Sequence, residues 1–127
     1  MGFGFYDDAS PVSTNSTADV VVRCARNGGP ASVDVTLRLG PSAGSGTIAT
    51  RQLRSGANAL NYNLYRDAAR TQVWGQTAGA DTVTMNINGI PNNGSRNGTF
   101  TIYGRIPALE NAPAGAYTDS VQMTISP

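Results

Sequence analysis

Apolar and polar residues alternate along several short stretches of the chain. The alternation is strictest over residues 32–39, and it recurs over residues 60–64. A period of two places every second side chain on the same face of a β-strand, so one face can enter a core while the other meets water. Weaker versions of the pattern predict further strands at residues 2–6, 20–24, 47–53, 81–87, 99–106 and 116–125.

Turn-forming residues separate these stretches. Asn27, Gly28, Gly29 and Pro30 form a strong turn signal. Glycine, proline, serine and asparagine are concentrated in three further segments, which predicts loops at residues 40–46, 89–98 and 107–115. No stretch keeps a helical period. Short strands with frequent turn signals and no helix predict an all-β sandwich.

Length and charge narrow the classes of protein that the chain can represent. The 127 residues are most simply a single domain over residues 1–127, large enough to bury roughly two-thirds of the unfolded surface. The net charge is +1, and the nine basic residues are arginines scattered along the chain. This pattern disfavours nucleic acid and anionic membranes as partners. No apolar run approaches the roughly 20 residues that span a bilayer.

The composition offers little to catalysis. The chain has no histidine or lysine, one glutamate (Glu110) and one cysteine (Cys24). Serine–histidine and cysteine–histidine nucleophiles are therefore excluded, as are histidine-based metal sites. We expect a protein that is not an enzyme and has no catalytic residue, metal or cofactor.

Five motifs occur in order along the chain. They are Phe3-Gly4-Phe5-Tyr6-Asp7, the strand Asp19 to Cys24, a central segment from Arg51 to Gly75, Tyr103 to Ala108, and Gly115 to Val121. The matching positions of the central segment are Arg51, Leu60, Tyr62, Leu64, Tyr65, Asp67, Trp74 and Gly75. Each motif alone is weak, but together they resemble the spore coat protein U family, which includes subunits of archaic (Csu-type) chaperone–usher pili.

The resemblance implies an immunoglobulin-like β-sandwich that is incomplete, because one strand comes from a partner or a neighbouring subunit. The implied function is a structural subunit of a bacterial surface fibre or spore coat, assembled by donor-strand complementation. Its partners would be a periplasmic chaperone, an usher and neighbouring copies, in a homopolymer or strand-swapped oligomer. The subunit would be exported through the periplasm to the cell surface, pilus or spore coat. The residues expected to line the donor-strand groove are Phe3, Phe5, Val121, Met123 and Ile125.

The same resemblance assigns other residues to the core or to a disulfide. The expected core positions are Leu60, Tyr62, Leu64, Trp74 and Tyr117. Cys24 could pair with a cysteine upstream of Met1, in the region where the donor extension and an export signal would also lie. Alternatively, Cys24 is a small buried hydrophobe beside Val20 and Val22, which share its parity.

A second function class remains open, namely an adhesin domain at a fibre tip. Such a domain would be a complete sandwich and would bind a surface or ligand through loops 40–46, 89–98 and 107–115. Arg51, Asp67, Arg105 and Asp119 could mark a binding site, although scattered charges are more often structural pairs or solvated strand faces. The choice between a pilus and a spore coat layer also stays open.

Overall fold

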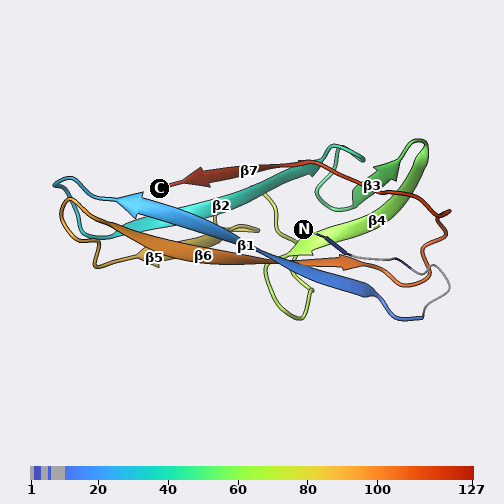
Figure 1. Cartoon of the computed structure of the whole chain (residues 1–127), viewed down its shortest axis with the longest axis horizontal. Helices are drawn as coiled ribbons and strands as arrows, with labels where there is room; N and C mark the ends of the chain where they lie inside the picture. The colour runs from blue at the N-terminus through green and yellow to red at the C-terminus, as the bar shows by residue number, and fades with distance from the viewer. Residues whose placement is uncertain (1, 4–5, 7–10) are drawn as a thin grey trace.

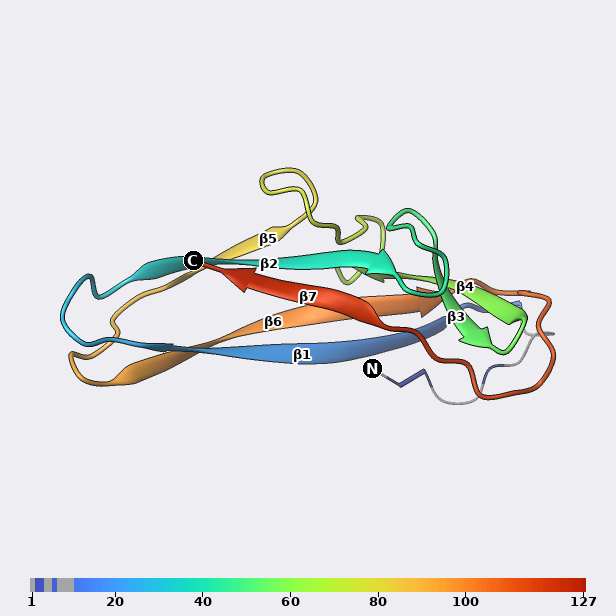
Figure 2. The same ribbon diagram turned by 90° about the horizontal axis from the view of Figure 1, so that it is seen from above.

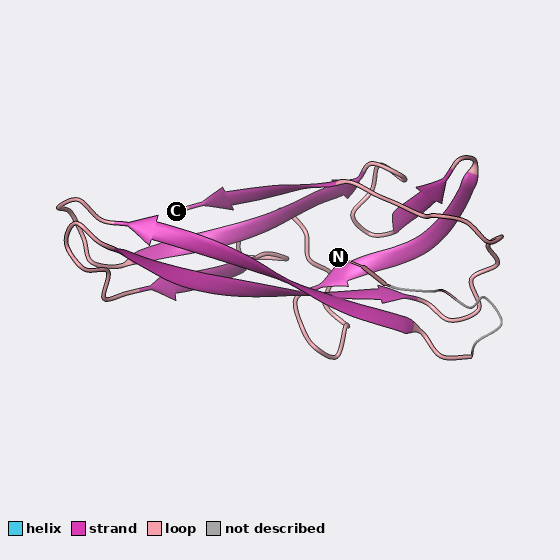
Figure 3. Cartoon of the chain, in the orientation of Figure 1, coloured by secondary structure: helices cyan, strands magenta, loops and turns pink. Residues whose placement is uncertain are grey.

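Strands account for all of the regular secondary structure in the computed structural model, which describes residues 2–3, 6 and 11–127 (Figures 1 and 3). The strands are β1 (Thr14–Ala25), β2 (Val33–Ser42), β3 (Arg51–Ser55), β4 (Asn58–Tyr65), β5 (Val83–Ile87), β6 (Ser95–Ile106) and β7 (Val121–Ser126). In the part of the chain that the structure describes, no helix is long and apolar enough to cross a bilayer.

The strands form two antiparallel sheets. One sheet has the order β1-β6-β4-β3 and the other has the order β5-β2-β7. Figure 2 shows the second sheet lying over the first, with the long strands of both running along the molecule. The prediction of an all-β, immunoglobulin-like sandwich is confirmed.

The alternating segments supply the core between the sheets. In β2, Val35, Leu37 and Leu39 are buried, while the polar residues between them are at least partly exposed. Phe100 of β6 packs edge-to-face on Trp74, with 6.3 Å between the ring centroids. The Trp74 indole N–H donates to the Leu37 carbonyl at 2.9 Å, so its polar atom is satisfied inside the core. Burial of such side chains stabilises the fold by about 1.5–3 kcal/mol each.

The side chain of Arg51 links the two sheets. Its side chain is fully buried, and its guanidinium donates to the carbonyls of Leu39, Gly40 and Trp74 at 2.8–3.3 Å. It also donates to Asn63 Oδ1 at 2.8 Å. Burial lowers the pKa of Arg51, while Tyr62, Asp119 and Asp81 act in the opposite direction. One side chain of β3 thus ties the first sheet to β2 of the second.

Several strand boundaries differ from the expectations. β1 begins six residues earlier than the apolar pattern, at Thr14, and β6 begins within the predicted loop, at Ser95. The extension of β1 (residues 14–19) pairs with residues 101–106 of β6, and the extension of β6 (residues 95–98) pairs with residues 22–25 of β1, so backbone hydrogen bonds hold both extensions. β2 continues into the predicted loop, to Ser42.

Other predicted strands are shorter or missing. The strand expected over residues 47–53 begins only at Arg51, and the last strand begins at Val121 rather than at residue 116. Gly2, Phe3 and Tyr6 lie outside any strand, so a strand over residues 2–6 is not seen in the described residues. The other residues of that segment, including Phe5, lie outside the described part of the chain.

Candidate functional site: the open side of the sandwich

The edge strand β7 exposes apolar side chains that face the core. β7 pairs with β2, and Ile125 lies opposite Leu37 while Met123 lies opposite Leu39. Opposed residues of paired strands carry their side chains on the same face. Nevertheless, Leu37 and Leu39 are 0% and 2% exposed, whereas Ile125 and Met123 are 42% and 48% exposed. Among the described strands, β2 has a neighbour on each side and β7 has a partner on one side only, so the side chains of β7 are less covered.

The edge strand β1 of the other sheet shows the same asymmetry. β1 pairs with β6, and Val20 lies opposite Phe100 while Val22 lies opposite Gly98. Phe100 is 2% exposed, but Val20 and Val22 are only partly buried against the core. Among the described strands, β1 also has a partner on one side only.

β1 and β7 are edge strands of different sheets, and each leaves core-facing apolar side chains partly exposed. The two strands run in the same direction along the molecule (Figure 1). We call this region the open side and define it by its core-facing side chains, Val20, Val22, Cys24, Met123 and Ile125. Its character is apolar, so it is suited to receiving apolar side chains.

Polar contacts surround the start of β7. The Tyr62 hydroxyl donates to Asp119 Oδ2, and Asp119 Oδ1 accepts from the Gly44 N–H at 3.0 Å. Burial raises the pKa of Tyr62, and the hydrogen bond to Asp119 raises it further. Arg54 and Thr118 exchange backbone hydrogen bonds of 2.7 and 2.9 Å, which tie β3 to the segment before β7.

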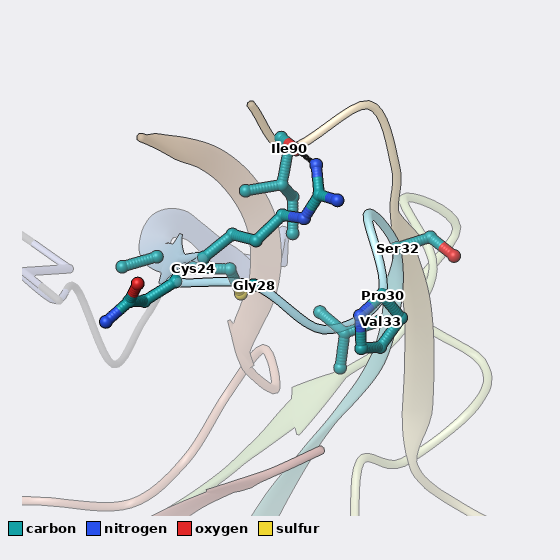
Figure 4. Close-up of a pocket in the computed structure, with 9 residues that line it drawn as sticks. Cys24, Gly28, Pro30, Ser32, Val33 and Ile90 are labelled. Carbon is teal, nitrogen blue, oxygen red and sulfur yellow. Dashed lines mark hydrogen bonds between the residues drawn. The ribbon is translucent and has the colours of Figure 1, made fainter. Parts of the chain in front are cut away.

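The far end of β1 leads into a pocket of about 350 Å³. Cys24, Val33 and Ile90 contribute to its lining, as Figure 4 shows. β7 ends at Ser126, opposite Thr36 of β2, so Val33 lies beyond the last residue pair of β7. The open side therefore continues past the end of β7 into this pocket.

The predicted site residues fall into distinct places. Met123 and Ile125 are exposed on the open side, and Val121 at the start of β7 is half-buried. Phe3 packs edge-to-face on Tyr62, with 6.0 Å between the ring centroids. Phe5 lies outside the described residues. The sequence analysis did not assign Val20 and Val22 to the acceptor groove. Alternation places both on one face of a strand, but it does not show that this strand is an edge of the sandwich.

The other predicted positions lie around the core. Leu60, Tyr62, Leu64 and Trp74 are buried. Tyr117 is half-buried against the same cluster, and its hydroxyl donates to the Pro113 carbonyl. Cys24 is a half-buried free cysteine, so its pairing with an upstream cysteine stays a prediction.

The four scattered charges serve local structure. Arg51 is buried among carbonyl groups and the Asn63 side chain, and Asp119 accepts hydrogen bonds from Tyr62 and Gly44 as described above. Asp67 accepts hydrogen bonds from Thr71 and Gln72, which lower its pKa, the Thr71 hydroxyl contributing most. Arg105 donates to Asn15 Oδ1. No cluster of three or more potential metal ligands occurs in the described residues.

The sequence model of the spore coat protein U domain family matches residues 1–124 of the chain. The chain belongs to the spore coat protein U domain family. The chain is also 32% identical, over 139 residues, to "Protein U" of Myxococcus xanthus, an alignment that covers 99% of this chain and 70% of that protein. The resemblance inferred from the five motifs is therefore confirmed. The family is one of structural coat or pilus proteins.

Proposed function

We propose that this spore coat U domain is a structural subunit of a bacterial surface fibre or spore coat, and that its open side accepts a β-strand from a neighbouring subunit. One observation carries the proposal. Ile125 and Met123 face the core in register with Leu37 and Leu39, yet they are 42% and 48% exposed. An added strand beside β7 would cover them.

The physical basis of assembly is β-strand addition. A donor strand completes the backbone hydrogen bonds of an exposed edge, and its alternate side chains fill the core beneath. About four or five apolar side chains, at roughly 1.5–3 kcal/mol each, give on the order of 6–15 kcal/mol. This is similar to the whole stability of a typical domain, about 5–15 kcal/mol. Donated strands can therefore hold a fibre together without covalent bonds.

The same physics motivates the proposed route of assembly. An unpaired edge with exposed core residues favours wrong pairing and aggregation. A periplasmic chaperone that supplies a temporary strand would prevent this, and an usher would then exchange that strand for one from the next subunit. The proposed product is a homopolymer or strand-swapped oligomer at the cell surface, in a pilus or spore coat.

The test uses a tethered strand. A copy of Val33–Leu39 (VDVTLRL), which alternates apolar and polar residues, is attached after Pro127 through a Gly/Ser linker. A linker of about 16 residues spans roughly 22 Å, which is about the length of a strand of seven residues. The linker can therefore reach either end of the acceptor edge, and the tethered strand can bind in either direction. We expect the melting temperature to rise by at least about 10 °C and light scattering to report a monomer.

The matched control carries aspartate at the third and fifth positions of the tethered copy (VDDTDRL). It keeps the length and the backbone but loses two apolar side chains, so we expect no stabilisation. A chain that melts at the same high temperature with either tether, and is monomeric without one, would contradict the proposal. That result would instead support a self-sufficient adhesin domain that binds through its loops.

A further inference from the structure

The N-terminal segment is attached to three separate parts of the sandwich. The Gly2 carbonyl accepts a hydrogen bond from the Ser16 hydroxyl of β1. The Phe3 ring packs edge-to-face on Tyr62 of β4. The Tyr6 hydroxyl donates to the Pro107 carbonyl at 2.8 Å and accepts from the N–H of residue 110 at 2.8 Å. These residues therefore link β1 to the connection between β6 and β7.

That connection, residues 107–120, leads from the end of β6 to the start of β7. It contains no regular strand, and most of its residues are exposed. Its start is held by the two Tyr6 contacts and by the Glu110 carboxylate, which accepts from the Asn61 N–H at 3.0 Å. Its end is held at Thr118 by Arg54 and at Asp119 by Tyr62, the residue on which Phe3 packs. The N-terminal segment thus contacts the connection directly at one end and through Tyr62 at the other.

We propose that Tyr6 and Phe3 are positioning residues for the β7 edge. They hold the connection in place, so that β7 keeps a fixed position relative to β1 before any strand arrives. This inference rests on the proposed function, because only a strand-accepting side requires two preformed edges. An acceptor that is already ordered loses less conformational entropy on binding, and it therefore captures a strand more readily.

The test compares hydrogen exchange in two matched tyrosine variants of the full chain. Tyr6→Phe removes only a hydroxyl that makes two hydrogen bonds. Tyr65→Phe removes a hydroxyl that makes no hydrogen bond within the described residues, and it leaves β4 otherwise unchanged. In Tyr6→Phe we expect the amides of residues 118–125 to exchange at least roughly fivefold faster, because two hydrogen bonds are lost and each contributes a factor of about two to twelve. Amides of the β1–β6 ladder should keep their rates, and Tyr65→Phe should change neither set.

A second readout measures capture of the free peptide VDVTLRL. The wild type and Tyr65→Phe should bind it at equal rates, and Tyr6→Phe should bind it several-fold more slowly. Faster exchange confined to residues 108–110, or an equal rise throughout the chain, would overturn the positioning role. If no variant binds the peptide, strand acceptance fails, while the exchange data still decide whether Tyr6 positions β7.

Discussion

Two regions beside β2 differ in how completely their buried groups are satisfied. Near its C-terminal end, the Leu39 and Gly40 carbonyls accept hydrogen bonds from Arg51, a side chain that is fully buried between the sheets. Along the side bounded by β7, Leu37 and Leu39 are buried, but their partners Ile125 and Met123 are 42% and 48% exposed. One region satisfies its buried polar groups internally, and the other leaves apolar groups uncovered.

This difference separates the residues that make the fold from those that make the proposed assembly. The hydrogen bonds that Arg51 donates to Leu39, Gly40, Trp74 and Asn63, here called the Arg51 corner, form within the chain itself. Substitutions there should therefore affect folding with or without a donor strand. In the proposed function the open side is completed by a donated strand, so substitutions there should have little effect until a strand is present. The following variants test that separation, beginning with the largest expected effect.

Arg51→Met should destabilise the chain most. The substitution fills part of the space but leaves the carbonyls of Leu39, Gly40 and Trp74 without their buried donor. Loss of such a network should lower the free energy of unfolding by about 3–5 kcal/mol, measured by urea denaturation. Arg54→Ala is the control on the same strand, because Arg54 is exposed. It should change stability by less than about 1 kcal/mol; equal losses for both variants would contradict the role of the Arg51 corner.

Tyr62→Phe should have an intermediate and pH-dependent effect. It removes the donor to Asp119, and hydrogen bonds to charged groups contribute about 1.5–3 kcal/mol. Because the pKa of Tyr62 is raised above its ordinary value of 10.0 in the folded state, this contribution is fully present below pH 10 and decreases as the pH rises further. The stability difference between the wild type and Tyr62→Phe, measured by urea denaturation from pH 7 to 11, should shrink above pH 10. A stability difference that stays constant from pH 7 to 11 would contradict the raised pKa of Tyr62.

Ile125→Asp should have a small effect on the isolated chain, below about 1 kcal/mol, because a side chain that is already exposed loses little burial. It should nevertheless abolish the stabilisation by the tethered strand, measured as the rise in melting temperature. Thr124→Asp is the matched control, since Thr124 is an exposed polar residue next to it on β7. If Thr124→Asp abolished the stabilisation equally, the core-facing side of β7 would not be the acceptor surface.

Asp67→Asn should have the smallest effect, confined to residues 66–72. The Asp67 carboxylate accepts from Thr71 and Gln72, so its pKa lies below the ordinary value of 3.8. The contribution to loop order is present above that ordinary value and is lost as the pH falls through the lowered pKa. NMR titration should show the Asp67 midpoint below 3.8, with amide shifts of Thr71 and Gln72 that follow it. In Asp67→Asn those amide shifts should no longer change with pH.

The sequence predicted the fold best where side chains determine the structure. Strict alternation placed β2 and the centre of β4 well, because every second residue enters the core. It failed at the start of β1, where Thr14, Asn15 and Ser16 carry no apolar signal and pairing with β6 holds the backbone. The alternation at residues 2–6 predicted a strand, but none of the described residues Gly2, Phe3 and Tyr6 pairs in a sheet. They make individual hydrogen bonds and a ring contact instead.

The candidate site was partly accessible from the sequence. Met123 and Ile125 follow from the alternation of the last strand and from the family resemblance. Val20 and Val22 require the sheet order, which alternation does not reveal. Arg51 has no signal in periodicity at all, since an arginine within a weak strand is most often solvated. Only the approach of β2 and Trp74 shows that this side chain is buried.

Hydrogen exchange along β1 and β7, with and without the tethered copy of Val33–Leu39, tests the central claim most directly. If the open side accepts a strand, alternate amides of β7 should exchange at least about a hundredfold more slowly with the tether, since those N–H groups gain carbonyl partners. The VDDTDRL control should leave the rates unchanged. Equal exchange in β7 with both tethers would contradict strand acceptance on this side of the sandwich.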